Sequence, residues 1–108
     1  MILQANGKIS STAKKDSSRI YAEIRIDKGK YPNFPHNKEG ELPVCLFIGQ
    51  ARHQTVIRER NKVKRYWISQ KEGLWELLEK HGYSLNDDIL LDIETDENPI
   101  MIKIGTKK

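Results

Sequence analysis

Residues 66–82 read YWISQKEGLWELLEKHG, and along this stretch the pattern of apolar residues changes from that of a strand to that of a helix. Ser69 is followed three residues later by Glu72, the spacing of a helix capping box, and Gly82 is the residue type that most often ends a helix. The sequence therefore predicts one amphipathic helix, from about Gln70 to His81, that covers the open side of a sheet. Its apolar stripe consists of Leu74, Trp75, Leu77 and Leu78.

The segments on both sides of this helix carry strand patterns. Some alternate apolar and polar residues, and one is continuously apolar. We therefore predict a mainly β (α+β) fold, an antiparallel barrel of about five to seven strands with the helix at one end. Residues 19–108 are predicted to form the single domain, with residues 1–18 as a mobile lead-in or an edge strand. The strand segments are Arg19–Lys30, Leu42–Gly49, the hairpin Gln54–Tyr66, and the closing hairpin formed by Ile89–Ile93 and Ile100–Ile104.

Charge is divided unevenly along the 108 residues. Residues 1–71 contain 15 Lys and Arg against six Asp and Glu, whereas residues 72–108 contain four against nine. A basic segment of this kind is typical of proteins that bind nucleic acid. The sequence has no apolar run of the roughly 20 residues that a membrane-spanning helix needs, and it has no secretory signal. We therefore expect a cytoplasmic protein, associated with the nucleoid if the source is bacterial.

Three segments in the second half of the chain resemble a known family: Tyr66–Ser69, Leu74–Gly82 and Leu85–Ile93. They are similar to the second half of the DNA-binding pseudobarrel family, the B-three domain of plant transcription factors, which also serves as the DNA-recognition domain of several bacterial restriction endonucleases. In that family a strand leads into a helix with an aromatic anchor, and a Leu-x-x-Gly-Asp turn then starts a buried strand. Here Asp87 replaces the glycine of this turn. Transcription regulators of the AbrB type share the same turn.

The resemblance implies a pseudobarrel that grips the DNA major groove with two projecting arms. The loop Gly29–Gly40 would be one arm, and the hairpin Gln54–Tyr66 would be the other. Arg and Asn can form paired hydrogen bonds with guanine and adenine, and Lys supplies charge opposite phosphates. The predicted DNA-binding residues are Lys28, Lys30, Tyr31, Asn33, His36, Lys38, Arg52, Gln54, Arg58, Arg60, Asn61, Lys62, Lys64 and Arg65.

Catalysis is not predicted. Asp92 and Glu94 have the Asp-x-Glu spacing of a nuclease metal motif, but only 14 residues follow them, so the remaining ligands have no place to come from. No Glu-x-Lys tripeptide of a restriction-nuclease core occurs, and the three histidines are widely spaced. Cys45, the one cysteine, lies in an apolar run and is expected to be a buried small side chain. We therefore predict no catalytic residue, no metal and no cofactor, and at most the recognition part of a nuclease.

Two sequence-specific functions are compatible with these features: delivery of a restriction endonuclease to its site, or regulation of transcription by double-stranded DNA binding. An AbrB-like regulator is one alternative. Another is a β-barrel that binds single-stranded nucleic acid or a protein partner through exposed aromatic side chains, namely Tyr31, Phe34 and Tyr66.

Overall fold

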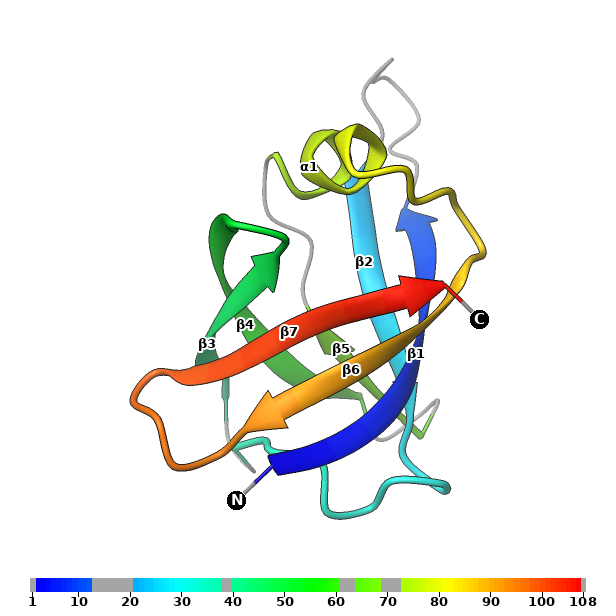
Figure 1. Cartoon of the computed structure of the whole chain (residues 1–108). Coiled ribbons are helices and arrows are strands. Elements are labelled where there is room, and N and C mark those ends of the chain that lie inside the picture. The colour runs from blue at the N-terminus through cyan, green and yellow to red at the C-terminus, as the bar shows by residue number, and fades with distance from the viewer. Residues whose placement is uncertain (1, 13–20, 38–39, 61–63, 69–72, 108) are drawn as a thin grey trace.

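The computed structural model describes residues 2–12, 21–37, 40–60, 64–68 and 73–107, and seven of its strands close into a barrel (Figure 1). Around the barrel the strands follow the order β1-β2-β5-β4-β3-β7-β6, and β6 pairs with β1 to close it. The bounds are β1 Ile2–Thr12, β2 Tyr21–Asp27, β3 Leu42–Ile48, β4 Ala51–Arg60, β5 Arg65–Ile68, α1 Leu74–Lys80, β6 Asp88–Glu94 and β7 Ile100–Lys107.

The predicted mainly β barrel with one helix is confirmed, with one difference in strand direction. The hairpins β4–β5 and β6–β7 form as expected, and every pair in the barrel is antiparallel except β3 with β7. The β6–β7 hairpin sets the direction of β7, and in this direction β7 runs parallel to its other neighbour, β3. Hairpin patterns alone could not predict it, since a pair between distant strands leaves no local turn signal.

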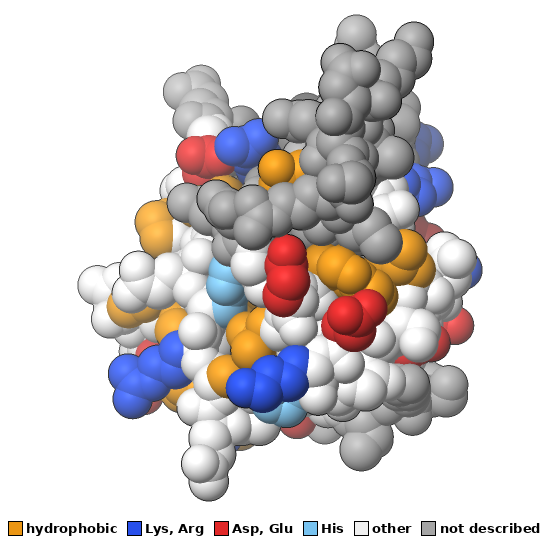
Figure 2. All heavy atoms as spheres, turned by 90° about the horizontal axis from the view of Figure 1, so that it is seen from above, with side chains coloured by type: hydrophobic (Ala, Val, Ile, Leu, Met, Phe, Trp, Pro, Cys, Tyr) orange, Lys and Arg blue, Asp and Glu red, His pale blue; other side chains and the backbone are white. Residues whose placement is uncertain are grey.

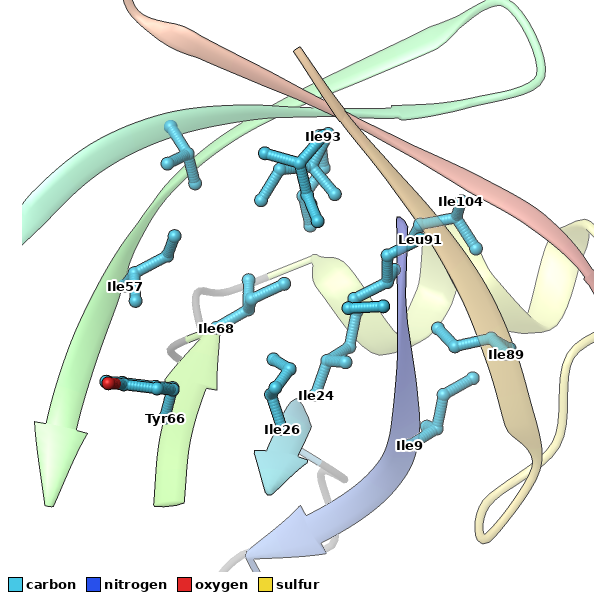
Figure 3. Close-up of a cluster of buried hydrophobic side chains, with 14 of the residues drawn as sticks. Ile9, Ile24, Ile26, Ile57, Tyr66, Ile68, Ile89, Leu91, Ile93 and Ile104 are labelled. Carbon is cyan, nitrogen blue, oxygen red and sulfur yellow. The ribbon is translucent and has the colours of Figure 1, made fainter. Parts of the chain in front are cut away.

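The core is the interior of the barrel and is almost entirely aliphatic (Figure 3). The alternation predicted for residues 19–30 places Ala22, Ile24 and Ile26 inside, each fully buried. In β3 the inward residues are also buried, and Cys45, which points outward, is only 8% exposed, so its assignment as a small buried side chain is confirmed. Alternation along each strand therefore decides which side chains point into the barrel.

Of the segment 1–18, residues Ile2–Thr12 form the strand β1. It pairs with β6 through Ile2–Lys8 and with β2 through Lys8–Thr12, so its first half has a strand neighbour on one side. Residues 13–20 lie outside the described residues. The few apolar residues of this segment made it look weakly structured, but Ala5 and Ile9 are enough to anchor it in the core, where they are 3% and 0% exposed.

The strand β1 passes close to its neighbours at Gly7. A Cβ atom at this position would lie 2.7 Å from Cγ2 of Ile24, which is closer than real Cβ contacts. The absence of a side chain therefore lets β1 pass close to β2 at Gly7. This is the residue before Lys8, where β1 begins to pair with β2 as well as with β6.

The helix α1 is described from Leu74, later than the predicted start at Gln70, and it lies across one end of the barrel (Figure 1). The residue before it is Gly73, with a φ of 93°, and the predicted capping box at Ser69–Glu72 lies outside the described residues. Leu74 and Leu78 are fully buried in the barrel core. The helix therefore closes this end of the barrel, as the sequence predicted.

The predicted end of the helix is confirmed. Gly82 has a φ of 86°, which suits a residue without a side chain, and the ring of His81 forms a 2.9 Å hydrogen bond with the carbonyl of Leu77. Figure 2 views this end: acidic side chains lie near the middle of the described surface, and the basic ones are scattered around them.

Candidate nucleic-acid interface

A hollow of about 550 Å³ lies on the outside of the barrel wall where β1, β2 and β5 adjoin. Four of the residues around it are basic, and one is acidic. We call this hollow the cationic groove. It is lined by Lys8, Ser10, Arg25, Ile26, Asp27, Lys64, Arg65 and Asn86.

The register of the strands brings these basic residues together from distant parts of the sequence. Lys8 of β1 lies opposite Arg25 of β2, and Arg25 lies opposite Trp67 of β5. The next strand continues the row, since Trp67 lies opposite Arg58 of β4. Directly opposite residues in adjacent strands point to the same side of the sheet, so all four side chains face outward. Arg65 lies two residues before Trp67 on β5, opposite Asp27.

Arg25 is the most constrained basic side chain of the groove. Its guanidinium carbon lies 5.0 Å from the ring centroid of Trp67, and Nη2 lies 3.8 Å from Oε1 of Glu23. The Glu23 carboxylate is buried and also accepts a 3.3 Å hydrogen bond from the Ser10 hydroxyl. About a third of the Arg25 side chain remains exposed. The indole and the buried carboxylate therefore hold the guanidinium in one place at the surface.

Acidic groups offset only part of the charge in the groove. Oδ1 of Asp27 accepts a 2.8 Å hydrogen bond from the amide of Gly29, so one of its oxygens is already engaged in a turn. Asp88 lies beside the groove, opposite Lys8 in the pairing of β1 with β6. The lining holds four basic residues against Asp27, and Glu23 and Asp88 lie next to it, so the cationic groove keeps a small excess of positive charge.

Residues 29–37 of the predicted arm Gly29–Gly40 lie at the barrel end opposite α1 (Figure 1). Phe34 is 3% exposed and its ring stacks on Tyr66, with 5.6 Å between the centroids. The hydroxyl of Tyr66 donates a 2.9 Å hydrogen bond to the carbonyl of Pro32. These contacts anchor the described part of the loop to the barrel core.

Two predicted contact residues near this loop are directed at Glu59 of β4. The Lys28 ammonium lies 2.6 Å from the Glu59 carboxylate, and Nε2 of His36 lies 3.7 Å from the same oxygen. Nδ1 of His36 is 2.6 Å from the carbonyl of Phe34, which fixes the ring. Lys28 and His36 thus link the loop to β4. Lys30 and Asn33 remain exposed, while Tyr31 is half-buried.

The predicted residues on β4 and β5 divide into three groups. Arg58 is half-exposed and forms an ion pair with Glu41. Arg52 and Gln54 are exposed, with Arg52 lying over the ring of Phe47. Only Lys64 and Arg65 of the predicted set line the cationic groove. Predicted residues whose side chains lie outside the described part of the structure are Lys38, Arg60, Asn61 and Lys62.

The sequence analysis missed Lys8, Ser10, Arg25 and Asn86. A signal for Arg25 was present, because the alternation of residues 19–30 already placed it on the polar face. Lys8 was hidden in the segment expected to be a lead-in. Its position opposite Arg25 depends on the register between two strands and cannot be derived from either strand alone.

The aromatic side chains expected to stack on single-stranded bases are mostly buried. Phe34 and Tyr66 are 3% and 0% exposed, so the expectation that they lie on the surface is wrong. Burial is also the main reason why the pKa of the Tyr66 hydroxyl is raised, with the nearby Glu59 carboxylate adding to it. Single-strand binding would therefore have to use other groups.

A second hollow, on the wall formed by β6 and β7, is acidic. It measures about 430 Å³ and includes Asp92 and Glu94, the pair with nuclease-like spacing. Oδ1 of Asp92 accepts a 3.0 Å hydrogen bond from the side-chain Nε2 of Gln4. Within residues 2–12, 21–37, 40–60, 64–68 and 73–107, no group of three His, Cys, Asp or Glu side chains is arranged to hold a metal ion. We call this hollow the acidic wall; its lining is Ile2, Gln4, Asp92, Glu94, Glu97, Met101 and Lys103.

Comparison with protein-family models, curated proteins and solved structures gave no significant match to the chain. In the described part of the chain, no helix is long and apolar enough to cross a membrane. The function is therefore inferred from the residues of this chain itself.

Proposed function

We propose that the chain is a sequence-specific binding domain for double-stranded DNA and that the cationic groove is the center of its interface. The observation that carries this proposal is the convergence of Lys8, Arg25, Lys64 and Arg65 on one outer wall of a rigid barrel. Clustered Lys and Arg side chains replace condensed counterions along the phosphate backbone, which is the main source of affinity for duplex DNA. Such a domain would serve as the recognition module of a restriction endonuclease or as a regulator.

The two kinds of basic side chain suit two tasks. Lys8 and Lys64 are exposed and suit phosphates, which an ammonium contacts as a point charge. Arg25 is held by Trp67 and Glu23, so it loses little freedom when it forms paired hydrogen bonds with a guanine. We assign base recognition to Arg25 and Arg65, and phosphate contact to the two lysines.

The hairpin β4–β5 extends this surface. Two-stranded ribbons fit the major groove of B-DNA, and Arg58 lies in the same outward row as Arg25. Both arginines have a carboxylate partner, but Arg58 donates a hydrogen bond from Nε to Glu41, whereas Nη2 of Arg25 lies 3.8 Å from Glu23, beyond hydrogen-bond distance. Binding DNA through Arg58 would require its hydrogen bond to open, so Arg25 is the stronger candidate for reading a base, and Arg58 contributes less.

The experiment that tests the proposal is a binding selection from a random pool of duplexes at low salt, followed by anisotropy titrations of the selected site. We expect enrichment of a defined sequence, with a log–log salt slope near −0.9 for each phosphate neutralised. The same titration with the separated strands provides the comparison. Equal affinity for a single strand, or no binding to any duplex, would overturn the proposal.

A further inference from the structure

The first half of β1 has a strand neighbour on one side only. Ile2–Lys8 pairs with β6, but pairing with β2 begins only at Lys8, opposite Arg25, and β2 ends at Asp27. Among the described residues, no strand therefore lies along the β2 side of Ile2–Asn6. An unpaired strand edge offers a row of main-chain donors and acceptors to another extended chain.

The main-chain groups of Gln4 and Asn6 point toward this open side. Ile9 exchanges hydrogen bonds of 3.0 and 2.7 Å with Asp87 and Asn86, on the β6 side of the strand. Main-chain direction alternates along a strand, so residues at even positions point the other way. The Asn6 amide confirms this direction, since it donates a 3.1 Å hydrogen bond to the hydroxyl of Tyr31. By the same alternation, the N–H and C=O of Gln4 face the open side.

A largely apolar hollow of about 210 Å³ lies beside this part of β1, between Leu3–Ala5 and the loop after β2. Its floor includes Ala5 and Phe34, both 3% exposed, and one side of it is the loop after β2. Lys30 stands at this hollow, with its ammonium 5.6 Å from the ring centroid of Tyr31. The complete lining is Leu3, Gln4, Ala5, Lys30, Tyr31, Pro32, Asn33, Phe34 and Ile93.

We propose that this open edge of β1 is a docking site for an extended segment of a partner protein, which adds as a short strand beside Ile2–Asn6. The main-chain groups of Gln4 would pair with the segment, and an apolar side chain of the segment would fill the hollow. The Lys30 ammonium is the charged side chain of this site, so the segment carries an acidic residue next to the apolar one. This peptide site is separate from the cationic groove and does not depend on DNA binding.

The test is a selection of random heptapeptides on the full chain, with the Gln4→Pro variant used to remove non-specific binders. Proline lacks the N–H that faces the open side, and it is tolerated on a strand edge where that N–H is not used by the sheet. Gln4→Ala keeps the N–H and is the matched control. We expect selected peptides with alternating apolar residues and an acidic residue. They should bind the wild type and Gln4→Ala alike, and Gln4→Pro at least tenfold more weakly.

Two further measurements keep the test decisive if Gln4→Pro does not fold. N-methylation of the selected peptide at its central amide should abolish binding, and Lys30→Glu should weaken binding of the acidic peptide while favouring a copy with lysine in its place. Lys64→Ala should leave peptide binding unchanged. The proposal is overturned if no peptide distinguishes wild type from Gln4→Pro and N-methylation has no effect. It is equally overturned if the edge pairs with a second copy of the chain, seen as a dimer that Lys30→Glu does not alter.

Discussion

The cationic groove and the acidic wall are built by the same rule and carry opposite charge. In both, alternate residues of adjacent strands point outward in register: Lys8 with Arg25 in one, Asp92 with Lys103 in the other. The difference arises from the strand order, which places β1 between β2, whose outward residues include Arg25, and the acidic strand β6. The net charge of +4 is a sum over the whole chain and does not predict the charge of either surface.

Reversing the charge of the cationic groove should have the largest effect on duplex binding. Lys8→Glu combined with Lys64→Glu should weaken duplex binding at least 100-fold at low salt, because two phosphate contacts become repulsive. Both lysines are exposed, so the fold should be retained. Anisotropy titration measures the affinity.

The matched control reverses two exposed lysines elsewhere, Lys80→Glu on α1 with Lys103→Glu on the acidic wall. At about 0.15 M salt the Debye length is about 8 Å, so distant charges are screened and affinity should change less than about threefold. Similar losses in both double variants would mean that the chain binds DNA by its overall charge.

A side chain at Gly7 should disturb the barrel itself. Gly7→Ala places a Cβ atom 2.7 Å from the Ile24 side chain, and we expect a loss of about 1–3 kcal/mol in the free energy of unfolding, as for other overpacked cores. Urea denaturation followed by circular dichroism measures it. Asn33→Ala, at an exposed loop position, is the control and should stay within about 0.5 kcal/mol. An unchanged urea midpoint for Gly7→Ala would contradict the close approach of Gly7 to Ile24.

Arg25 and Arg58 test whether an arginine held against an aromatic ring reads bases better than one hydrogen-bonded to a carboxylate. Arg25→Ala should cost about 1–3 kcal/mol in binding of the selected site and reduce the discrimination against altered base pairs. Arg58→Ala should cost less, because Arg58 is already paired with Glu41. A set of single-base duplex variants measures the discrimination. An equal, sequence-independent loss in both would assign both arginines to phosphates.

The two lysines should each have a small and uniform effect. Lys8→Ala and Lys64→Ala are expected to weaken binding of all duplexes to a similar extent and to reduce the salt slope by about one each. Titrations at four salt concentrations give the slope. If either variant changed sequence preference instead, that lysine would belong with the base-reading residues.

The smallest expected effect lies in alkaline stability. Burial raises the pKa of Tyr66 above the usual 10.0, so the folded state disfavours the phenolate. Stability is therefore full below pH 10 and falls as the pH rises through the folded pKa. Tyr66→Phe cannot ionise, and it should lose the Pro32 hydrogen bond but show a flatter decline above pH 10. Thermal melting between pH 8 and 11 measures the two slopes, and parallel slopes would contradict this account.

The local features of the fold could be predicted from the sequence, and the site could be predicted only in part. The apolar alternation from Ala22 to Ile26 and the stop at Gly82 act within a few residues, so their patterns are readable. The groove depends on which strands lie side by side. Lys64 and Arg65 were predicted as part of a basic hairpin, but their neighbours Lys8 and Arg25 are chosen by pairing between distant segments.

The same limit explains the loop after β2. Its glycine, prolines and aromatic residues predicted a loop correctly, yet Phe34 is in the core and His36 contacts Glu59. An aromatic residue in a loop can be exposed for binding or buried as an anchor, and only the space left at the barrel end decides between the two.

The closure of the barrel also has a consequence for folding kinetics. Residues Ile2–Lys8 complete their ladder with Asp88–Glu94, and β3 completes its own with β7, so both closing pairs join segments far apart in the sequence. Closing such long loops costs conformational entropy before strand pairing stabilises the chain. Folding therefore slows as contacts become less local. On the ribosome Ile2–Lys8 must wait until Asp88–Glu94 has been synthesised. Until then, its edge toward β6 is open to chaperones and to neighbouring nascent chains.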